Sequence, residues 1–95
     1  MQVTEVRIRK VESDASGHLK AYVTVTFDDS FVVHNVKIIE GSNGLFVAMP
    51  SRKTASGVYK DVAHPVNPEF RKHLQDKILE EYNAGHFVTD SSPEE

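Results

Sequence analysis

The sequence predicts an α+β fold, in which an antiparallel β-sheet of about five short strands, arranged as a meander, is packed by one C-terminal α-helix. Three features predict it. Apolar and polar residues alternate in short runs through most of the chain, as they do in half-buried strands. Turn residues separate these runs, which favours hairpins over helical crossovers. Apolar residues then recur with a helical period after residue 67.

The first two predicted strands cover residues 3–11 and 19–27. In the first strand, VTEVRIRKV, an apolar face alternates with a face that carries Arg7 and Arg9. A turn at DASG joins the two strands, with Gly17 at positive φ. The second strand alternates between an apolar face (Ala21, Val23, Val25, Phe27) and a polar face (Tyr22, Thr24, Thr26).

The remaining predicted strands form two further hairpins. The turn DDS leads into FVVHNVKII (31–39), and the turn cluster EGSNG leads into the apolar run LFVAM. Pro50 ends that run. We expect VYKDVA (58–63) to return beside LFVAM as its hairpin partner, with PSRKTASG as the connecting loop.

A helix is predicted to begin at the segment HPVNP. Asn67 is placed as the N-cap, Pro68 as the first helical residue and Glu69 near the positive end of the helix dipole. Gly85 is predicted to end the helix. The apolar stripe expected to lie across one face of the sheet consists of Phe70, Leu74, Ile78, Leu79 and Tyr82.

The length of 95 residues corresponds to one domain, expected at residues 1–88, with a polar, acidic tail at 89–95 expected to be disordered. So short a chain buries only about 60–65% of its unfolded surface, and without cysteine it has no disulfide to add stability. Pairing with a second chain is the remaining source of stability. The size therefore favours pairing with a second chain.

The formal net charge of −3 arises in the tail, because residues 1–88 hold 11 basic and 11 acidic groups. Any affinity for a polyanion must come from local clustering of cations. The chain shows no secretory h-region and no run of 18 apolar residues. With the absence of cysteine, this predicts a cytoplasmic protein without membrane insertion.

The main candidate site is the basic loop, where Ser51 and Thr54 flank Arg52 and Lys53, and Lys60 follows. A hairpin tip is exposed, and hydroxyls beside cations suit a small phosphate clamp. The alternative is a loop whose cations only keep it soluble.

Two further cations, Arg71 and Lys72, lie in the first turn of the predicted helix, where the dipole disfavours positive charge. They invite a functional explanation as additional nucleic-acid contacts. However, Asp76 lies four residues after Lys72, and such a pair is also an ordinary structural feature. Both interpretations stay open.

No catalytic, metal or cofactor site is predicted. The five histidines show no ligand spacing such as HxxxH, and His34 falls in an apolar row with Val32 and Val36, which favours a partly buried structural histidine. Ser51, His64 and Asp61 are the residue types of a triad, but no nucleophile elbow or oxyanion loop accompanies them. The segment GSNG is too short for a phosphate-binding P-loop. We therefore expect a protein that is not an enzyme.

Three segments resemble one known family. VTEVRIRKV, FVVHNVKIIEGSNGLFVAMPSRKT and DVAHPVN together are similar to the stage V sporulation protein G family, whose members are named septation proteins. The similarity runs from residue 3 to about residue 82. It implies a small α+β homodimer that binds DNA and RNA and influences septation, cell division, sporulation and gene expression.

The family's basic pair after the MPS tripeptide corresponds to Arg52 and Lys53. The family usually has Lys then Arg, the reverse of this chain. Phosphate contacts tolerate that exchange, whereas bidentate guanine recognition by the second position does not. Ala55 also stands where family members often have Pro, which predicts a looser loop.

Two other functions remain open. The chain is alternatively a protein-interaction module of the septation machinery, in which a strand edge or the outer helix surface recruits a partner. A binder that prefers RNA is the third possibility, because Tyr22, Phe31 and Tyr59 are able to stack on bases, although each is equally explained by packing on the sheet.

Overall fold

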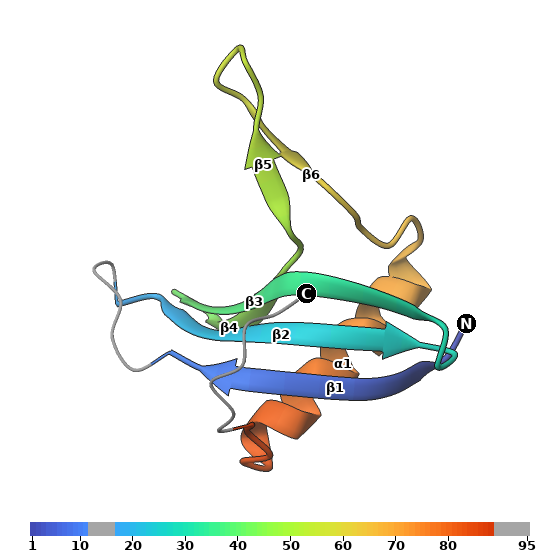
Figure 1. The fold of residues 1–95 in the computed structure, drawn as a ribbon. Helices are drawn as coiled ribbons and strands as arrows, with labels where there is room; N and C mark the ends of the chain where they lie inside the picture. Colours follow the sequence, from blue (N-terminus) through green and yellow to red (C-terminus); the bar gives the residue numbers. More distant parts are fainter. Residues whose placement is uncertain (12–16, 89–95) are drawn as a thin grey trace.

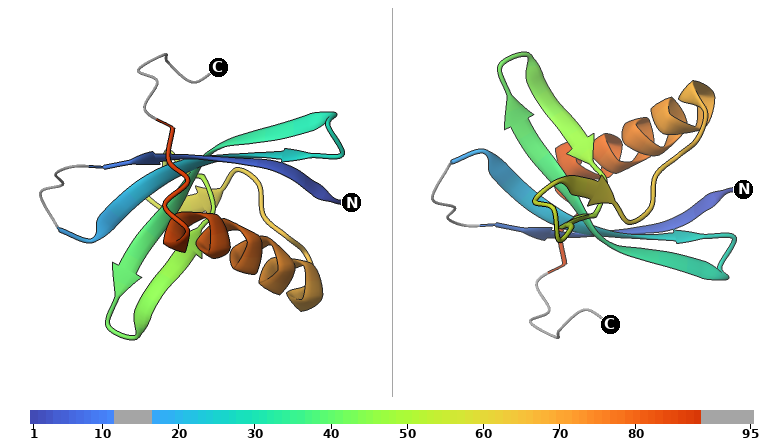
Figure 2. Two further views of the ribbon diagram at one scale, coloured as in Figure 1. Left: turned by 90° about the horizontal axis from the view of Figure 1, so that it is seen from below. Right: turned by 90° about the horizontal axis from the view of Figure 1, so that it is seen from above.

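The computed structural model describes residues 1–11 and 17–88. Its main sheet is antiparallel, with the strand order β1-β2-β3-β4. Figure 1 shows a two-stranded ribbon, β5–β6, projecting away from this sheet, and the views in Figure 2 show helix α1 lying across one of its faces. The elements are β1 (Val3–Lys10), β2 (Leu19–Phe27), β3 (Phe31–Gly41), β4 (Gly44–Ala48), β5 (Ser51–Lys53), β6 (Tyr59–Asp61) and α1 (Pro68–Asn83).

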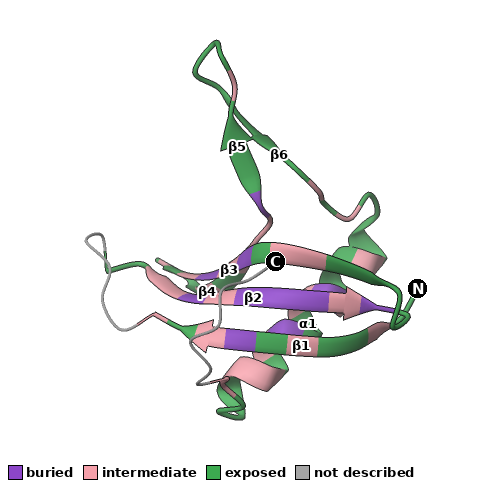
Figure 3. Cartoon of the chain, in the orientation of Figure 1, coloured by how far each residue is buried: buried purple, intermediate pink, exposed green. Residues whose placement is uncertain are grey.

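The α+β class is confirmed, with an antiparallel sheet packed by one C-terminal helix. The core lies between the helix and the inner face of the sheet, which is the face that the apolar alternation predicts (Figure 3). Its buried members are Ile8, Ala21, Val23, Val25, Phe27, Val36, Ile38, Leu74 and Ile78. The opposite face of the sheet, called the outer face below, is not covered by the helix. The homodimer stays a prediction.

Both ends of α1 form as predicted. The Asn67 side chain accepts a hydrogen bond from the Phe70 N–H at 2.7 Å, which satisfies one of the free donors of the first turn. At the other end Gly85 has a φ of +79°, a conformation that costs glycine nothing. The Gly85 N–H donates to Tyr82 O at 3.1 Å and the His86 N–H to Glu81 O at 3.2 Å, the bonding pattern of a Schellman motif.

A bulge in β3 changes which side chains face the core. Asn35 has a φ of +66°, and the register with β2 shifts around it. Val33 is paired with the buried Val25, so Val33 faces the core, and the ladder resumes beyond the bulge at Val36. The prediction that His34 shares the apolar row with Val36 is therefore wrong. The extra residue reverses the alternation and turns His34 toward the outer face.

The predicted fifth strand does not join the main sheet. Residues 59–61 pair with β5, and among the described residues β4 pairs only with β3. Pro50 separates the two ladders because it has no N–H, while its carbonyl accepts the Val62 N–H at 2.7 Å. The prediction that LFVAM and VYKDVA form a hairpin is therefore wrong, because VYKDVA pairs with β5 instead. The predicted loop PSRKTASG is also too long, because its residues 51–53 form a strand. Arg52 and Lys53 lie in strand β5, and residues 54–57 form the tip.

Two smaller outcomes complete the fold. The predicted turn over residues 40–44 is shorter, since Gly41 and Gly44 are paired in the β3–β4 ladder. Gly17 has the expected positive φ, at +75°. The rest of the DASG turn and the predicted disordered tail at 89–95 lie outside the described residues. Over the residues that the structure describes, no helix is both long and apolar enough to span a membrane.

Candidate nucleic-acid interface

The β5–β6 ribbon places two cations directly across from each other. Arg52 is the cross-strand partner of Lys60, and Lys53 is the partner of Tyr59. Because successive residues of a strand point to opposite faces, Arg52 and Lys60 share one face and Lys53 projects from the other. Like charges directly opposite each other destabilise a strand pair. The position of Lys60 is therefore unfavourable for the ribbon by itself.

These cations are exposed and not neutralised within the described parts of the chain. Every residue of β5 and β6 is exposed (Figure 3). Within residues 1–11 and 17–88, the side chains of Arg52, Lys53 and Lys60 make no ion pair or hydrogen bond. Asp61 belongs to the same ribbon, but it lies opposite Ser51 on the face away from Lys60.

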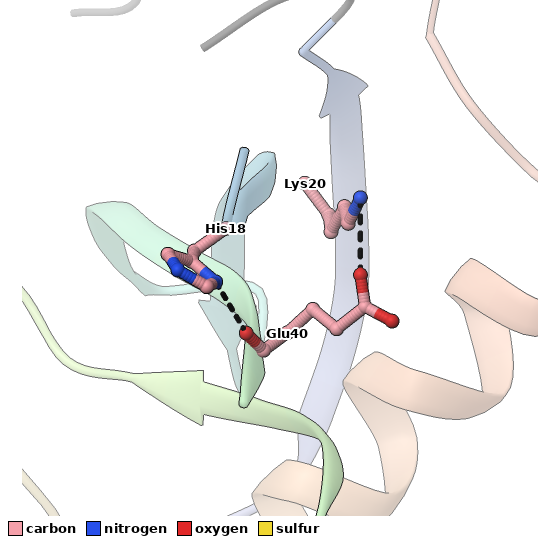
Figure 4. A network of polar contacts seen from close by, with 3 residues as sticks. All are labelled: His18, Lys20 and Glu40. Carbon is pink, nitrogen blue, oxygen red and sulfur yellow. Dashed lines mark hydrogen bonds and ion pairs between the residues drawn. The ribbon is translucent and has the colours of Figure 1, made fainter. Parts of the chain in front are cut away.

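Lys20 shows the contrasting situation. Its Nζ lies 3.2 Å from Glu40 Oε1, and His18 Nδ1 lies 3.1 Å from the Glu40 carbonyl oxygen (Figure 4). This cation has a carboxylate partner of its own. Lys20 is thus paired with a carboxylate of the sheet, whereas the cations of the ribbon have no such partner within the described residues and can contact an external anion.

The two hydroxyl residues predicted for the clamp have different roles. Thr54 closes the tip of the ribbon, because its N–H donates to Val58 O at 2.8 Å and its hydroxyl oxygen lies 3.0 Å from Ser56 Oγ. The Gly57 N–H donates to Thr54 O at 2.9 Å. Ser51 is exposed at the base of the ribbon. Thr54 is therefore part of the scaffold, and Ser51 is the more accessible hydroxyl.

Arg71 and Lys72 lie on a different element. The Arg71 guanidinium donates to Pro65 O at 3.3 Å, and Lys72 Nζ lies 2.8 Å from Asp76 Oδ2. The hydrogen bond to Asp76, together with the attraction of its charge, raises the pKa of Lys72 above its usual 10.5. The structure brings Ser51, Arg52, Lys53, Thr54 and Lys60 together on the ribbon and leaves Arg71 and Lys72 engaged locally on α1.

The residues of the hypothetical triad are not assembled for catalysis. His64 Nδ1 lies 3.1 Å from Pro65 O, so this ring has a local partner at the connection between ribbon and helix. No hydrogen bond joins His64 to Ser51 or Asp61 among the described residues. In the same parts of the chain, no group of three His, Asp or Glu side chains is arranged to hold a metal ion.

A second set of cations on the outer face was not assembled from the sequence. Arg9 is the cross-strand partner of Tyr22, and Tyr22 is in turn the partner of Lys37. They line an open groove of about 730 Å³ between the outer face and the base of the ribbon. Alternation had placed Arg9 and Tyr22 on polar faces, but only the registers of two hairpins bring them beside Lys37.

Comparison with known proteins finds relatives that match most of the chain. A family model described as SpoVG matches residues 1–84. A relative from Clostridium novyi strain NT, named "Putative septation protein SpoVG", is 61% identical over 84 residues, which cover 88% of this chain and 82% of the relative.

Two further relatives carry the same name. The protein from Caldicellulosiruptor saccharolyticus is 60% identical over 84 residues, covering 88% of this chain and 93% of the relative. The protein from Caldanaerobacter subterraneus is 58% identical over 82 residues, covering 86% and 88%. The region that the family model matches includes the sheet, the ribbon and the helix, and ends before the acidic tail.

Proposed function

The chain belongs to the SpoVG family, and from that premise we propose that it is a non-enzymatic regulator that binds DNA and RNA as a homodimer. In this proposal the β5–β6 ribbon grips phosphates, and the bound protein influences septation, cell division and the expression of sporulation genes. It acts in the cytoplasm, where the nucleic acid is.

The observation that carries the proposal is the pairing of Arg52 with Lys60. A two-stranded ribbon has little stability of its own, and two like charges across it lower that stability further. An external anion between the two side chains would remove their repulsion and stabilise the ribbon, since each cation donates charge-assisted hydrogen bonds to phosphate oxygens. Lys53 would extend the contact from the other face of the ribbon.

A homodimer is supported by the apolar surface that one chain leaves uncovered. Phe31 is 66% exposed, Val62 is 64% exposed and Val66 is 87% exposed. A contiguous apolar patch on a small protein commonly marks a contact with another chain. Two-fold pairing would present two ribbons on one particle, so that a protein with a neutral folded part is able to hold a polyanion.

The proposal is tested by replacing Arg52 and Lys53 together with alanine. Because two cations are removed from each protomer, we expect mobility shifts of DNA and RNA to require much more protein, with both nucleic acids affected alike. The matched control is the double replacement of Arg71 and Lys72, an Arg–Lys pair that is engaged locally on α1. This control is expected to have the smaller effect.

The competing function is the protein-interaction module. If the Arg52→Ala, Lys53→Ala variant keeps its circular dichroism spectrum and oligomeric state and still shifts DNA and RNA as the unmodified protein does, the ribbon is not the nucleic-acid contact. The cations of the ribbon would then serve solubility alone.

A further inference from the structure

The β5–β6 ribbon is a narrow arm. Figure 1 shows it projecting from the sheet, and every residue of its two strands is exposed. Paired strands lie about 4.8 Å apart, and sheets that pack face to face lie about 10 Å apart. A two-stranded ribbon with side chains on both faces is therefore about 10 Å thick. Its three residue pairs span about 10 Å along the strands, and the tip extends beyond them.

The major groove of B-form DNA has matching dimensions. It is about 12 Å wide and 8.5 Å deep, and it admits a two-stranded ribbon. Thr54, where the tip begins, lies two residues or about 7 Å beyond Arg52. With the tip at the floor of the groove, Arg52 and Lys60 would lie at its rim, where the phosphates are. Asp61, which is paired with Ser51 at the base of the ribbon, would stay outside.

The cations are distributed over both faces of the ribbon. Arg52 and Lys60 are cross-strand partners on one face, and Lys53 projects from the other. None of the three makes an ion pair or hydrogen bond within the described residues. A single row of phosphates would contact only one of these faces. The major groove has a phosphate backbone along each of its two walls, so that both faces contact phosphates at once.

The tip of the ribbon is small, neutral and held by hydrogen bonds. The Val58 N–H donates to Thr54 Oγ1 at 3.3 Å, and the Gly57 N–H donates to Thr54 O at 2.9 Å. The side chains of Ala55 and Ser56 are exposed. An alanine methyl group packs against the thymine methyl group, and a serine hydroxyl bonds to the edge of any base. No large side chain of the tip therefore prevents its approach to the floor of the groove.

We propose that the ribbon inserts tip first into the major groove of duplex DNA, with Arg52 and Lys60 on the phosphates of one wall and Lys53 on those of the other. This inference rests on the proposed function and deepens it by naming the form of nucleic acid and the groove. Duplex RNA is A-form, and its major groove is too narrow and deep for the ribbon. A single strand has no groove, so its phosphates contact the cations alone.

The first test blocks the tip without changing its charge. The sequence contains no cysteine, so Ala55→Cys provides one thiol, to which a neutral polyethylene glycol maleimide is attached. In fluorescence anisotropy the conjugate should bind duplex DNA as weakly as Arg52→Ala, Lys53→Ala does, because its cations no longer reach the groove walls. Its affinity for the single strand should be kept. Ser42→Cys, exposed in the turn between β3 and β4, is the matched control and with the same polymer should bind normally.

Two measurements on the unmodified protein keep the test decisive if Ala55→Cys folds poorly. Dimethyl sulfate methylates guanine N7, which faces the major groove, and adenine N3, which faces the minor groove. Bound protein should protect N7 and leave N3 reactive. A duplex RNA of the same sequence should bind more weakly than the duplex DNA at the same salt concentration, since the ribbon does not enter its major groove.

The possible failures are distinguishable. If Arg52→Ala, Lys53→Ala weakens binding but the Ala55→Cys conjugate binds duplex DNA normally, or if adenine N3 is protected in place of guanine N7, the ribbon grips phosphates from outside the major groove. The proposed function then stands and this inference is wrong. If neither change affects binding of duplex DNA, both are wrong. If the conjugate turns a two-chain species into a single chain in sedimentation, the tip is a contact between copies, and the inference is overturned.

Discussion

Single cations of this protein differ in what surrounds them. Lys72 and Arg52 are both exposed, but Lys72 has Asp76 at 2.8 Å, while Arg52 faces another cation across the ribbon. An exposed i,i+4 pair is common on helices and stabilises them slightly. A cation opposite a cation has no such structural reason. Both side chains are exposed, so exposure does not distinguish them. Their neighbours do: the carboxylate beside Lys72 indicates a structural role, and the cation opposite Arg52 indicates a binding role.

The Lys72–Asp76 pair gives a pH-dependent prediction. Because Asp76 raises the pKa of Lys72 above 10.5, the pair stabilises the folded protein fully below pH 10.5, and this contribution is lost as the pH rises through the folded-state pKa. Replacement of Asp76 by Asn should lower the pKa of Lys72, as measured by NMR titration of its side chain. The side chains are 78% and 60% exposed, so the change in stability at neutral pH should be small. An unchanged titration of Lys72 would contradict the contact.

The N-cap of α1 gives a second prediction. Asn67→Ala removes the acceptor of the Phe70 N–H and should lower the free energy of unfolding by about 1 kcal/mol, measured by urea denaturation. Asn67→Asp is the control, since its carboxylate also caps a helix and suits the positive end of the dipole. An equal loss of unfolding free energy in both variants would show that Asn67 does not stabilise the helix as its N-cap.

At the scale of elements, the ribbon combines weak structure with concentrated charge. It consists of two three-residue strands, and its tip is closed by the hydrogen bonds of Thr54. The sheet beneath it is fixed by the core and by α1. A rigid sheet thus supports a ribbon whose own strand pairing is weakened by its cations, which is the arrangement expected of a binding element on a scaffold.

A change at Lys60 is therefore expected to affect the stability of the ribbon and the binding of nucleic acid in opposite directions. Lys60→Glu would place opposite charges across the two strands, a change worth about 0.2–1 kcal/mol in favour of pairing. Amide hydrogen exchange at Thr54 should slow accordingly, since its N–H donates to Val58 O within the ribbon. Affinity for nucleic acid should fall at the same time.

Lys60→Gln provides the comparison, because it removes the repulsion without adding an attraction or a negative charge. The rate of amide exchange and the nucleic-acid affinity of Lys60→Gln should lie between those of the unmodified protein and those of Lys60→Glu. Faster exchange in the Glu variant, or unchanged affinity, would contradict the proposed role of the Arg52–Lys60 pair.

For the whole molecule, the distribution of charge matters more than its sum. The chain has a net charge of −3, but the surface of its ribbon presents three cations, Arg52, Lys53 and Lys60, that make no ion pair within the described residues. Two copies would double the number of these surfaces. Binding strength should therefore depend on the dimer rather than on one chain.

The salt dependence of binding measures the number of phosphate contacts that the bound protein makes. Two or three phosphate contacts in each protomer predict a slope of log affinity against log salt concentration of about −4 to −5 for a dimer on duplex DNA. Titrations at several salt concentrations, with the oligomeric state measured in parallel by sedimentation, give the value. A slope of about −2 to −3 with a single-chain species would show that one ribbon acts alone.

Features governed by near neighbours in the sequence were predictable. The cap at Asn67, the stop at Gly85 and the helical stripe around Leu74 follow from local hydrogen bonding and a fixed helical period. The two-residue alternation likewise identified the core face of β2. The cluster of Arg52 and Lys53 was visible in the sequence, and both are exposed as expected, although they lie in strand β5 rather than in the connecting loop.

Strand pairing decided the rest, because the partner of a strand and the register of the pair depend on residues distant in the sequence. One residue at the Asn35 bulge moved His34 to the outer face, and one proline divided a predicted hairpin into two ladders. Only the folded sheet placed Arg9, Tyr22 and Lys37 in one row and Arg52 opposite Lys60. The sequence by itself determined the fold class and the helix with both of its ends, whereas the arrangement of charges that suggests a function required the tertiary structure.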